Sequence, residues 1–274
     1  MRKTPLQIGV FVCAAGAFGV FFRWLQLQLA FDNGLAGPSL WNFVVPLSIL
    51  AVAWLFRRFV EQYRDERCHL PTEFHAALKN DLLLYRMVRI AIGAVMCLGA
   101  LLLFAGAETD PNTVFLRVIA AAGLLTGLSW MLLLREANRE PGESRVWLLC
   151  LYSLIPVLFF VVLLVYDYKA NSLNSVIWAY VIEILTVCVS ILAFFRVAGF
   201  AFGQPNAEKA MRLCMLGAFL CFMSLADERK TGLQIMFFAC AMQQVLYAWI
   251  MVANLEQGEA PPPPEQPSDG FERL

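Results

Sequence analysis

The sequence predicts an all-α protein that crosses a membrane about eight times, and three observations lead to this fold class. Hydrophobic residues make up 60% of the 274 residues, and charged residues make up only 15%. The mean hydropathy is +0.65, and the apolar residues form long continuous runs. A soluble domain carries about 25% charged residues. This composition therefore excludes a soluble enzyme, a nucleic-acid-binding module and a disordered chain.

Eight segments meet or approach the length of about 20 apolar residues that a spanning helix needs. The intervals between them are too short for a soluble domain, so residues 1–255 form a single transmembrane domain. The predicted spans are residues 6–30, 40–58, 86–106, 113–134, 147–166, 176–196, 212–226 and 232–253. Residues 256–274 are rich in proline and acidic residues, which predicts a disordered cytoplasmic tail.

The first four spans follow from the residues that flank or interrupt them. The apolar run that begins after Lys3 continues to about Ala30 without a cleavage site, so it is an uncleaved span rather than a signal peptide. The longest loop, from Arg57 to Tyr85, separates the second span from the third. In the fourth span, Gly123 and Gly127 form a GxxxG pattern, which we interpret as a helix-packing surface.

The last four spans are bounded in the same way. The fifth carries Pro156 near its middle, and a proline bends a helix. The sixth ends at Arg196, the seventh begins at Arg212, and the eighth ends just before Asn254. Similar residues begin spans in both halves of the chain, for example Arg89 and Arg212. This similarity predicts a weak parallel repeat of four plus four spans.

The positions of lysine and arginine predict the orientation, because cytoplasmic loops retain these residues. With the amino terminus inside, the outer side holds only Lys169, Arg229 and Lys230. Arg23 and Arg117 lie within spans, and all other lysines and arginines fall on the inner side. The sequence therefore predicts a multi-pass protein of the cell (plasma or inner) membrane with both termini in the cytoplasm.

Three ionisable groups inside spans are the main candidates for a functional site. A charged group costs about 2.5–3.5 kcal/mol at the centre of a membrane helix, so it needs a reason to be there. Arg23, Arg117 and Glu183 are all expected in the outer half, at most about 13 Å from a helix end at 1.5 Å per residue. Their shared depth predicts an outward-facing polar pocket. Alternatively, the arginines extend to the headgroups and Glu183 is a structural residue.

Polar residues near these charges extend the candidate pocket, since residues three or four apart share a helix face. A pair of glutamines on the eighth span adds amide groups near the middle of the membrane. The predicted pocket residues are Glu183, Arg23, Arg117, Tyr180, Thr186, Gln26, Gln243 and Gln244.

The sequence predicts no cofactor, no metal site and no catalytic site. Seven of the eight cysteines lie in or beside spans and are interpreted as packing residues in the thiol form. Cys68, His69 and His75 lie close together in the loop after the second span, but their spacing matches no established zinc pattern. Because the spans lack histidine and the chain lacks nucleotide-binding and metalloprotease motifs, we expect no enzyme activity.

Two functions remain open from the sequence. The favoured one is transport or permeation of a small solute, anionic if the arginines bind it, through the outward-facing pocket. The alternative is a non-catalytic membrane subunit or sensor that binds a cytoplasmic protein through the 61–81 loop or the Pro-rich tail. The lipid bilayer is an expected partner, a homo-oligomer is compatible with eight spans, and no nucleic-acid partner is expected.

Overall fold

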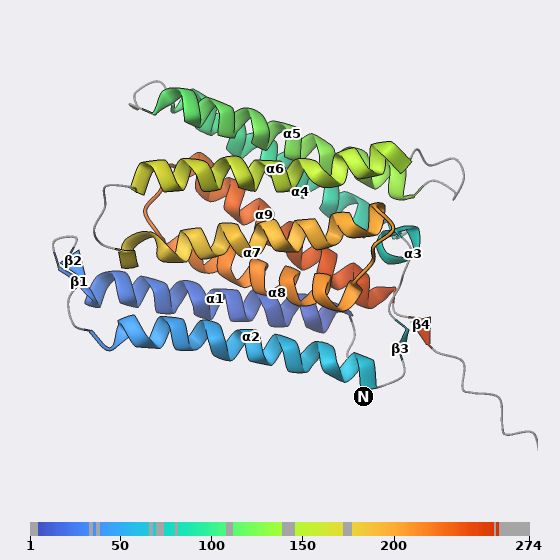
Figure 1. The fold of residues 1–274 in the computed structure, drawn as a ribbon, viewed down its shortest axis with the longest axis horizontal. Helices are drawn as coiled ribbons and strands as arrows, with labels where there is room; N and C mark the ends of the chain where they lie inside the picture. Colours follow the sequence, from blue (N-terminus) through green and yellow to red (C-terminus); the bar gives the residue numbers. More distant parts are fainter. Residues whose placement is uncertain are drawn as a thin grey trace, which may run out of the picture.

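The computed structural model describes residues 5–32, 35–36, 39–65, 68–69, 74–79, 82–107, 112–138, 146–171, 177–254 and 256–257. Long helices lie side by side through this part of the chain (Figure 1). They are α1 (Pro5–Leu29), α2 (Trp41–Asp65), α4 (Leu83–Ala105), α5 (Thr113–Ala137), α6 (Val146–Asn171), α7 (Ile177–Ala201), α8 (Ala207–Met223) and α9 (Thr231–Ala253). Together they provide 8 segments long and apolar enough to cross a membrane. The predicted all-α polytopic bundle is therefore confirmed.

Short elements connect these helices. They are α3 (Phe74–Leu78), the 3₁₀ turn η1 (Ser224–Ala226), and the strands β1 (Phe31–Asp32), β2 (Leu35–Ala36), β3 (Cys68–His69) and β4 (Glu256–Gln257). β1 pairs with β2 and β3 with β4, both antiparallel. The remainder of the predicted tail lies outside the described residues. We refer to the end of the bundle where α1 begins and α9 ends as the terminal end, and to the opposite end as the distal end.

α9 lies at the centre of the bundle and is the most deeply buried of the described spans. α1, α8, α7, α6, α5 and α4 follow one another around it in this order, and α2 packs on α1 and α8. Within the described helices, α1 and α4 both pack on α9 but do not pack along each other. The ring is therefore open between α1 and α4.

This arrangement gives no support to the four-plus-four repeat. In such a repeat α2 would correspond to α7, α4 to α8, and α5 to α9. However, α7 packs along α8, whereas the described parts of α2 and α4 do not pack along each other. α9 is also central, while α5 lies in the surrounding ring between α4 and α6.

Glycines allow the closest helix contacts around α4. A Cβ atom on Gly127 of α5 would lie 2.7 Å from the carbonyl oxygen of Gly93, and a Cβ on Gly99 would lie 2.9 Å from that of Gly232 on α9. Gly123 faces the side chain of Met236 on α9. Small residues let helix backbones approach in this way where lipid supplies no hydrophobic drive. The interpretation of the GxxxG pattern as a packing surface is confirmed.

The helix in the long loop, α3, is docked on the terminal end of the bundle. Phe74, Ala77 and Leu78 are buried. The side-chain amide of Asn254, just after α9, donates to the carbonyl oxygens of Ala77 and Lys79 at 3.0 and 2.9 Å. The apolar face of α3 is therefore covered by this protein itself.

Candidate functional site

Five ionisable residues lie together near the distal end, and we refer to them as the distal ion cluster. They are Arg23, Asp167, Glu183, Asp227 and Arg229. α1, α6 and α7 each supply one of them, and the segment between η1 and α9 supplies Asp227 and Arg229. All are largely shielded, from 0% exposure for the Arg23 side chain to 17% for that of Glu183. Charges so far from water need compensating charges close by.

Asp227 holds the cluster together by contacting both guanidinium groups. Its Oδ1 lies 2.7 Å from Nε of Arg23, and its Oδ2 lies 3.3 Å from Nη2 of Arg229. Arg229 in turn places its Nε 3.1 Å from Oε1 of Glu183. This chain of contacts links α1 to α7 through the segment that follows η1.

Asp167 completes the cluster from α6. It is buried, and its carboxyl group lies within interaction range of that of Glu183. An ionised carboxylate is only an acceptor, so two carboxyl groups bond each other only when one of them carries a proton. Fully ionised, the three carboxylates would exceed the two guanidinium groups by one negative charge. A single shared proton makes the cluster neutral, which is the chemistry of a proton-binding site.

Three neutral side chains contact the cluster. Gln26 accepts a hydrogen bond from Nη1 of Arg23 at 2.6 Å and donates to Oδ1 of Asn42 on α2 at 3.1 Å. Gln234 donates to the backbone oxygen of Asp227 at 3.3 Å. The guanidinium carbon of Arg229 lies 4.4 Å from the ring centre of Phe237, a cation–π contact. The predicted grouping of Gln26 with Arg23 therefore matches the geometry.

Of the three charges predicted from depth, the structure brings two together and leaves the third apart. Arg23 and Glu183 are joined through Asp227 and Arg229. Arg117 lies exposed on α5, with its guanidinium carbon 5.6 Å from the ring centre of Phe104 on α4. Arg117 lies outside the distal ion cluster despite its similar predicted depth, because α5 lies across the ring from α1.

The predicted residues closer to mid-membrane form a separate polar group. Thr186, one turn from Glu183, donates to the backbone oxygens of Ile182 and Leu220 at 2.7 and 3.3 Å. Gln244 of α9 donates to the hydroxyl of Ser190 on α7 at 3.2 Å. These bonds connect α7 to α8 and α9 and involve no charge.

The last two predicted residues take different positions. Tyr180 is half-buried on α7, one turn closer to the distal end than Glu183. Gln243 is fully buried and lies one turn of α9 from Tyr247, whose ring contacts Arg89. Arg89 was expected on the inner side of the membrane. Instead, it lies six residues after the first residue of α4, about 9 Å into the helix, and is fully buried.

Three members of the distal ion cluster were missed by the sequence prediction. Asp167 follows a predicted span that ended at residue 166, whereas α6 continues to Asn171. Asp227 and Arg229 were assigned to an outer loop. Their segment follows the shortest of the spanning helices. The short length of the predicted seventh span was therefore the sequence signal that the residues after it lie within the bundle.

The described residues contain no group of three or more His, Cys, Asp or Glu side chains positioned to hold a metal ion. The seven cysteines of the described helices are free thiols, as predicted. Comparison with protein-family models, curated proteins and solved structures finds no match to this chain.

Proposed function

We propose that this integral membrane protein is a transporter of the cell membrane that couples the movement of a small anionic solute to a proton. The observation that carries the proposal is the close approach of the shielded Asp167 and Glu183 carboxyl groups inside the distal ion cluster. The positions of lysine and arginine support an orientation with both termini in the cytoplasm and the distal end outside.

The contacts of the cluster suggest how a proton could move helices. Its members come from α1, α6, α7 and the segment before α9. Two of the ion pairs, Arg23 with Asp227 and Glu183 with Arg229, therefore tie together elements that are distant in sequence. Protonation of Glu183 would weaken its contact with Arg229, while Arg23 and Asp227 would stay paired. Release of one tie between helices is the kind of change that biases a bundle between two arrangements.

The charge balance implies that the proton binds before the solute. Without a proton the cluster carries one excess negative charge, which repels an anion. With a proton it is neutral, and the Nη1 group of Arg229 is buried with no hydrogen-bond partner among the described residues. Arg229 thus takes the role predicted for Arg117, as the cation that would contact an anionic solute.

The test uses purified protein in liposomes that contain the pH dye pyranine. Inward gradients of phosphate, sulfate and succinate serve as the solute probes, and a rapid pH jump on a solid-supported membrane measures charge movement without a solute. We expect at least one anion to acidify the lumen. The signal should be lost in Glu183→Gln and Arg229→Gln, and it should remain in Arg117→Gln.

Two results would refute this function. The first is a well-folded Glu183→Gln protein that acidifies the lumen at the parent rate. The second is the absence of both anion-driven acidification and pH-jump current in the parent protein.

The alternative of a non-catalytic subunit or sensor has less support. The apolar face of α3 in the 61–81 loop is buried against the bundle, so the exposed part of that loop would have to supply the contact. Deletion of residues 258–274 tests the tail separately. If the tail binds a cytoplasmic partner, its deletion should abolish capture of that partner and leave proton movement unchanged.

A further inference from the structure

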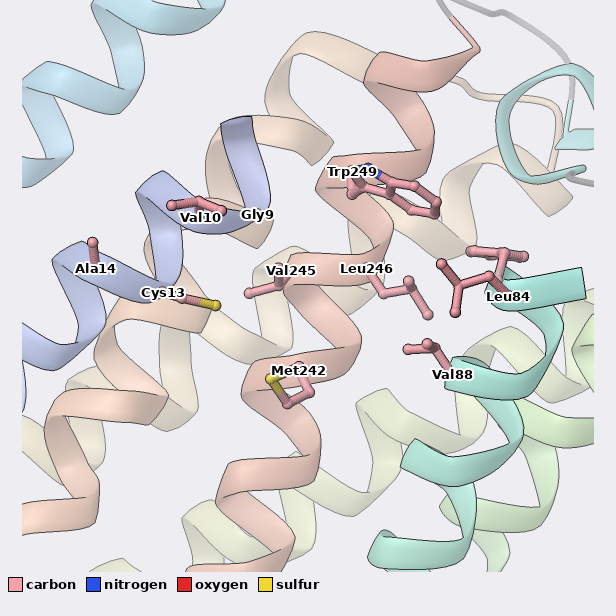
Figure 2. Close-up of a pocket in the computed structure, with 11 residues that line it drawn as sticks. Gly9, Val10, Cys13, Ala14, Leu84, Val88, Met242, Val245, Leu246 and Trp249 are labelled. Carbon is pink, nitrogen blue, oxygen red and sulfur yellow. The ribbon is translucent and has the colours of Figure 1, made fainter. Parts of the chain in front are cut away.

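A groove runs along the opening between α1 and α4, with α9 as its floor (Figure 2). Its volume is about 620 Å³, within the range of small-molecule sites. Cys13 and Val10 line it from α1, Leu84 from α4, and Leu246 and Trp249 from α9. Val10 and Leu84 are 62% and 69% exposed, so the groove is open to the surrounding lipid.

A buried cation lies beside this groove. Tyr85 lines the groove, and its hydroxyl accepts a hydrogen bond from Nη1 of Arg89 at 3.2 Å. The guanidinium carbon of Arg89 lies 6.0 Å from the Tyr85 ring centre and 5.7 Å from that of Tyr247. Val88, the residue before Arg89, also lines the groove. One tyrosine side chain therefore separates the apolar groove from a positive charge.

The polar groups around this cation are incompletely satisfied. Arg89 is fully buried, yet its Nε and Nη2 have no hydrogen-bond partner among the described residues, and no carboxylate there pairs with it. Gln243 lies near the Tyr247 hydroxyl, but neither of its amide atoms reaches hydrogen-bond geometry with a described group. Arg23 is equally buried and has Asp227 as its partner. Arg89 therefore has unused capacity for an anion.

We propose that the groove and Arg89 together bind a single-chain anionic amphiphile, with its alkyl chain between α1 and α4 and its carboxylate or phosphate on Arg89. A guanidinium pairs with either head through charge-assisted hydrogen bonds, and the amide of Gln243 adds a donor. Leu83 and Leu84 are exposed and apolar, so Arg89 lies below the interface. A single-chain acid can slide along the groove to that depth, whereas a two-chain phospholipid headgroup stays at the interface.

Rotation of the Tyr85 side chain joins the groove to the charge. Its ring is stacked on Trp249, with ring centres 5.9 Å apart, and both residues line the groove. When the ring turns, its hydroxyl leaves Arg89 and the anion takes its place. This binding site is at the terminal half of the bundle and does not depend on the proposed transport function.

The test uses the full-length protein in nanodiscs of neutral phosphatidylcholine. The probes are hexadecanoate, hexadecyl phosphate and hexadecanol, together with acetate and inorganic phosphate as heads without a chain. Thermal unfolding and quenching of tryptophan by brominated hexadecanoate are measured. We expect the two charged amphiphiles to raise the unfolding temperature more than the alcohol does. Acetate and phosphate should have no effect, and Trp249→Phe should reduce the quenching.

Variants separate the head from the chain. Arg89→Gln should raise the half-saturating concentration of hexadecanoate roughly tenfold or more, which is the loss of a hydrogen bond to a charged group. Arg117→Gln, which changes an exposed arginine on α5, is the matched control and should bind as the parent does. If Arg89→Gln does not fold, Leu246→Trp fills the groove while Arg89 remains, and it should abolish the binding.

Three outcomes would overturn the proposal. Equal stabilisation by hexadecanol would mean that the charge plays no part. Equal stabilisation by acetate or inorganic phosphate would mean that the site takes a soluble anion without a chain. Parent-like hexadecanoate binding in a folded Arg89→Gln or Leu246→Trp variant would place the amphiphile elsewhere.

Discussion

Replacement of Asp227 by asparagine tests whether the distal ion cluster holds the bundle together. The Asp227→Asn change keeps the size of the side chain but removes the charge that faces Arg23 at 2.7 Å and Arg229 at 3.3 Å. Arg23 has 0% side-chain exposure, so its charge cannot turn to water. Removing one partner of a buried pair costs about 3–5 kcal/mol. Because Gln26 still bonds Arg23 and the introduced amide oxygen can still accept a hydrogen bond, we expect the lower end, about 3 kcal/mol.

The assay is SDS-induced unfolding of the purified protein in mixed micelles, followed by a thiol-reactive dye. The buried thiols of Cys214, Cys221 and Cys240 become reactive only when the helices separate. Arg23→Gln and the double variant complete a thermodynamic cycle. We expect the double variant to be less destabilised than the sum of the single variants by about 1–3 kcal/mol, the usual coupling of residues in contact. Additivity to within about 0.5 kcal/mol would refute the ion pair as a structural link.

Three further predictions use the same unfolding assay. Gly127→Ala places a Cβ 2.7 Å from the Gly93 oxygen and should cost about 1–3 kcal/mol of stability. Gly9→Ala, where the nearest neighbour of the added Cβ is Val245 at 3.9 Å, should change stability by less than about 0.5 kcal/mol. Equal effects of the two variants would contradict the close α4–α5 contact. Asn254→Ala removes two hydrogen bonds to the 74–79 segment, so it should cost about 1–2 kcal/mol and speed proteolysis there; unchanged proteolysis would count against docking of α3. Asp167→Asn removes the excess negative charge, and the introduced amide can donate a hydrogen bond to Glu183, so stability should change by less than about 1 kcal/mol. A loss of stability as large as that of Asp227→Asn would show that the Asp167 charge is itself required.

The sequence was sufficient to predict the bundle because the chemistry of spanning a bilayer repeats in every helix. About 20 apolar residues and flanking polar residues define each span, and all eight predicted spans correspond to helices. The predicted boundaries differ from the structure where a helix continues beyond its apolar run. α2 continues to Asp65, well past the predicted end at residue 58, since charged residues are good helix formers outside the membrane.

The residues of the candidate site were predictable only in part. The depth of a residue in the membrane follows from its position in one helix, whereas the distance between two residues depends on how their two helices pack. Arg23 and Glu183 could be placed at similar depth, but nothing in their own helices indicated which neighbours they face. Arg117 has the same depth and lies elsewhere, on the far side of the ring. Asp227 and Arg229 were missed because loop residues are normally taken to be solvated. They are shielded here, where Asp227 pairs with Arg23 of α1 and Arg229 pairs with Glu183 of α7.

The contrast between Arg23 and Arg89 separates the two candidate sites. Both guanidinium groups are fully buried, and burial of a charge is costly unless a compensating charge is close. Arg23 has Asp227 and Gln26, so its cost is offset within the chain. Arg89 has one tyrosine hydroxyl and two aromatic rings, and cation–π contacts of about 0.5–2 kcal/mol each compensate a buried charge less fully. Removal of the charge should therefore have opposite effects at the two positions when no anion is added. Arg23→Gln should lower the stability of the bundle, because it leaves Asp227 with one cation fewer. Arg89→Gln should leave the stability of the bundle unchanged or raise it, because no carboxylate among the described residues pairs with Arg89. A large loss of stability would mean that a counter-charge for Arg89 lies outside the described residues.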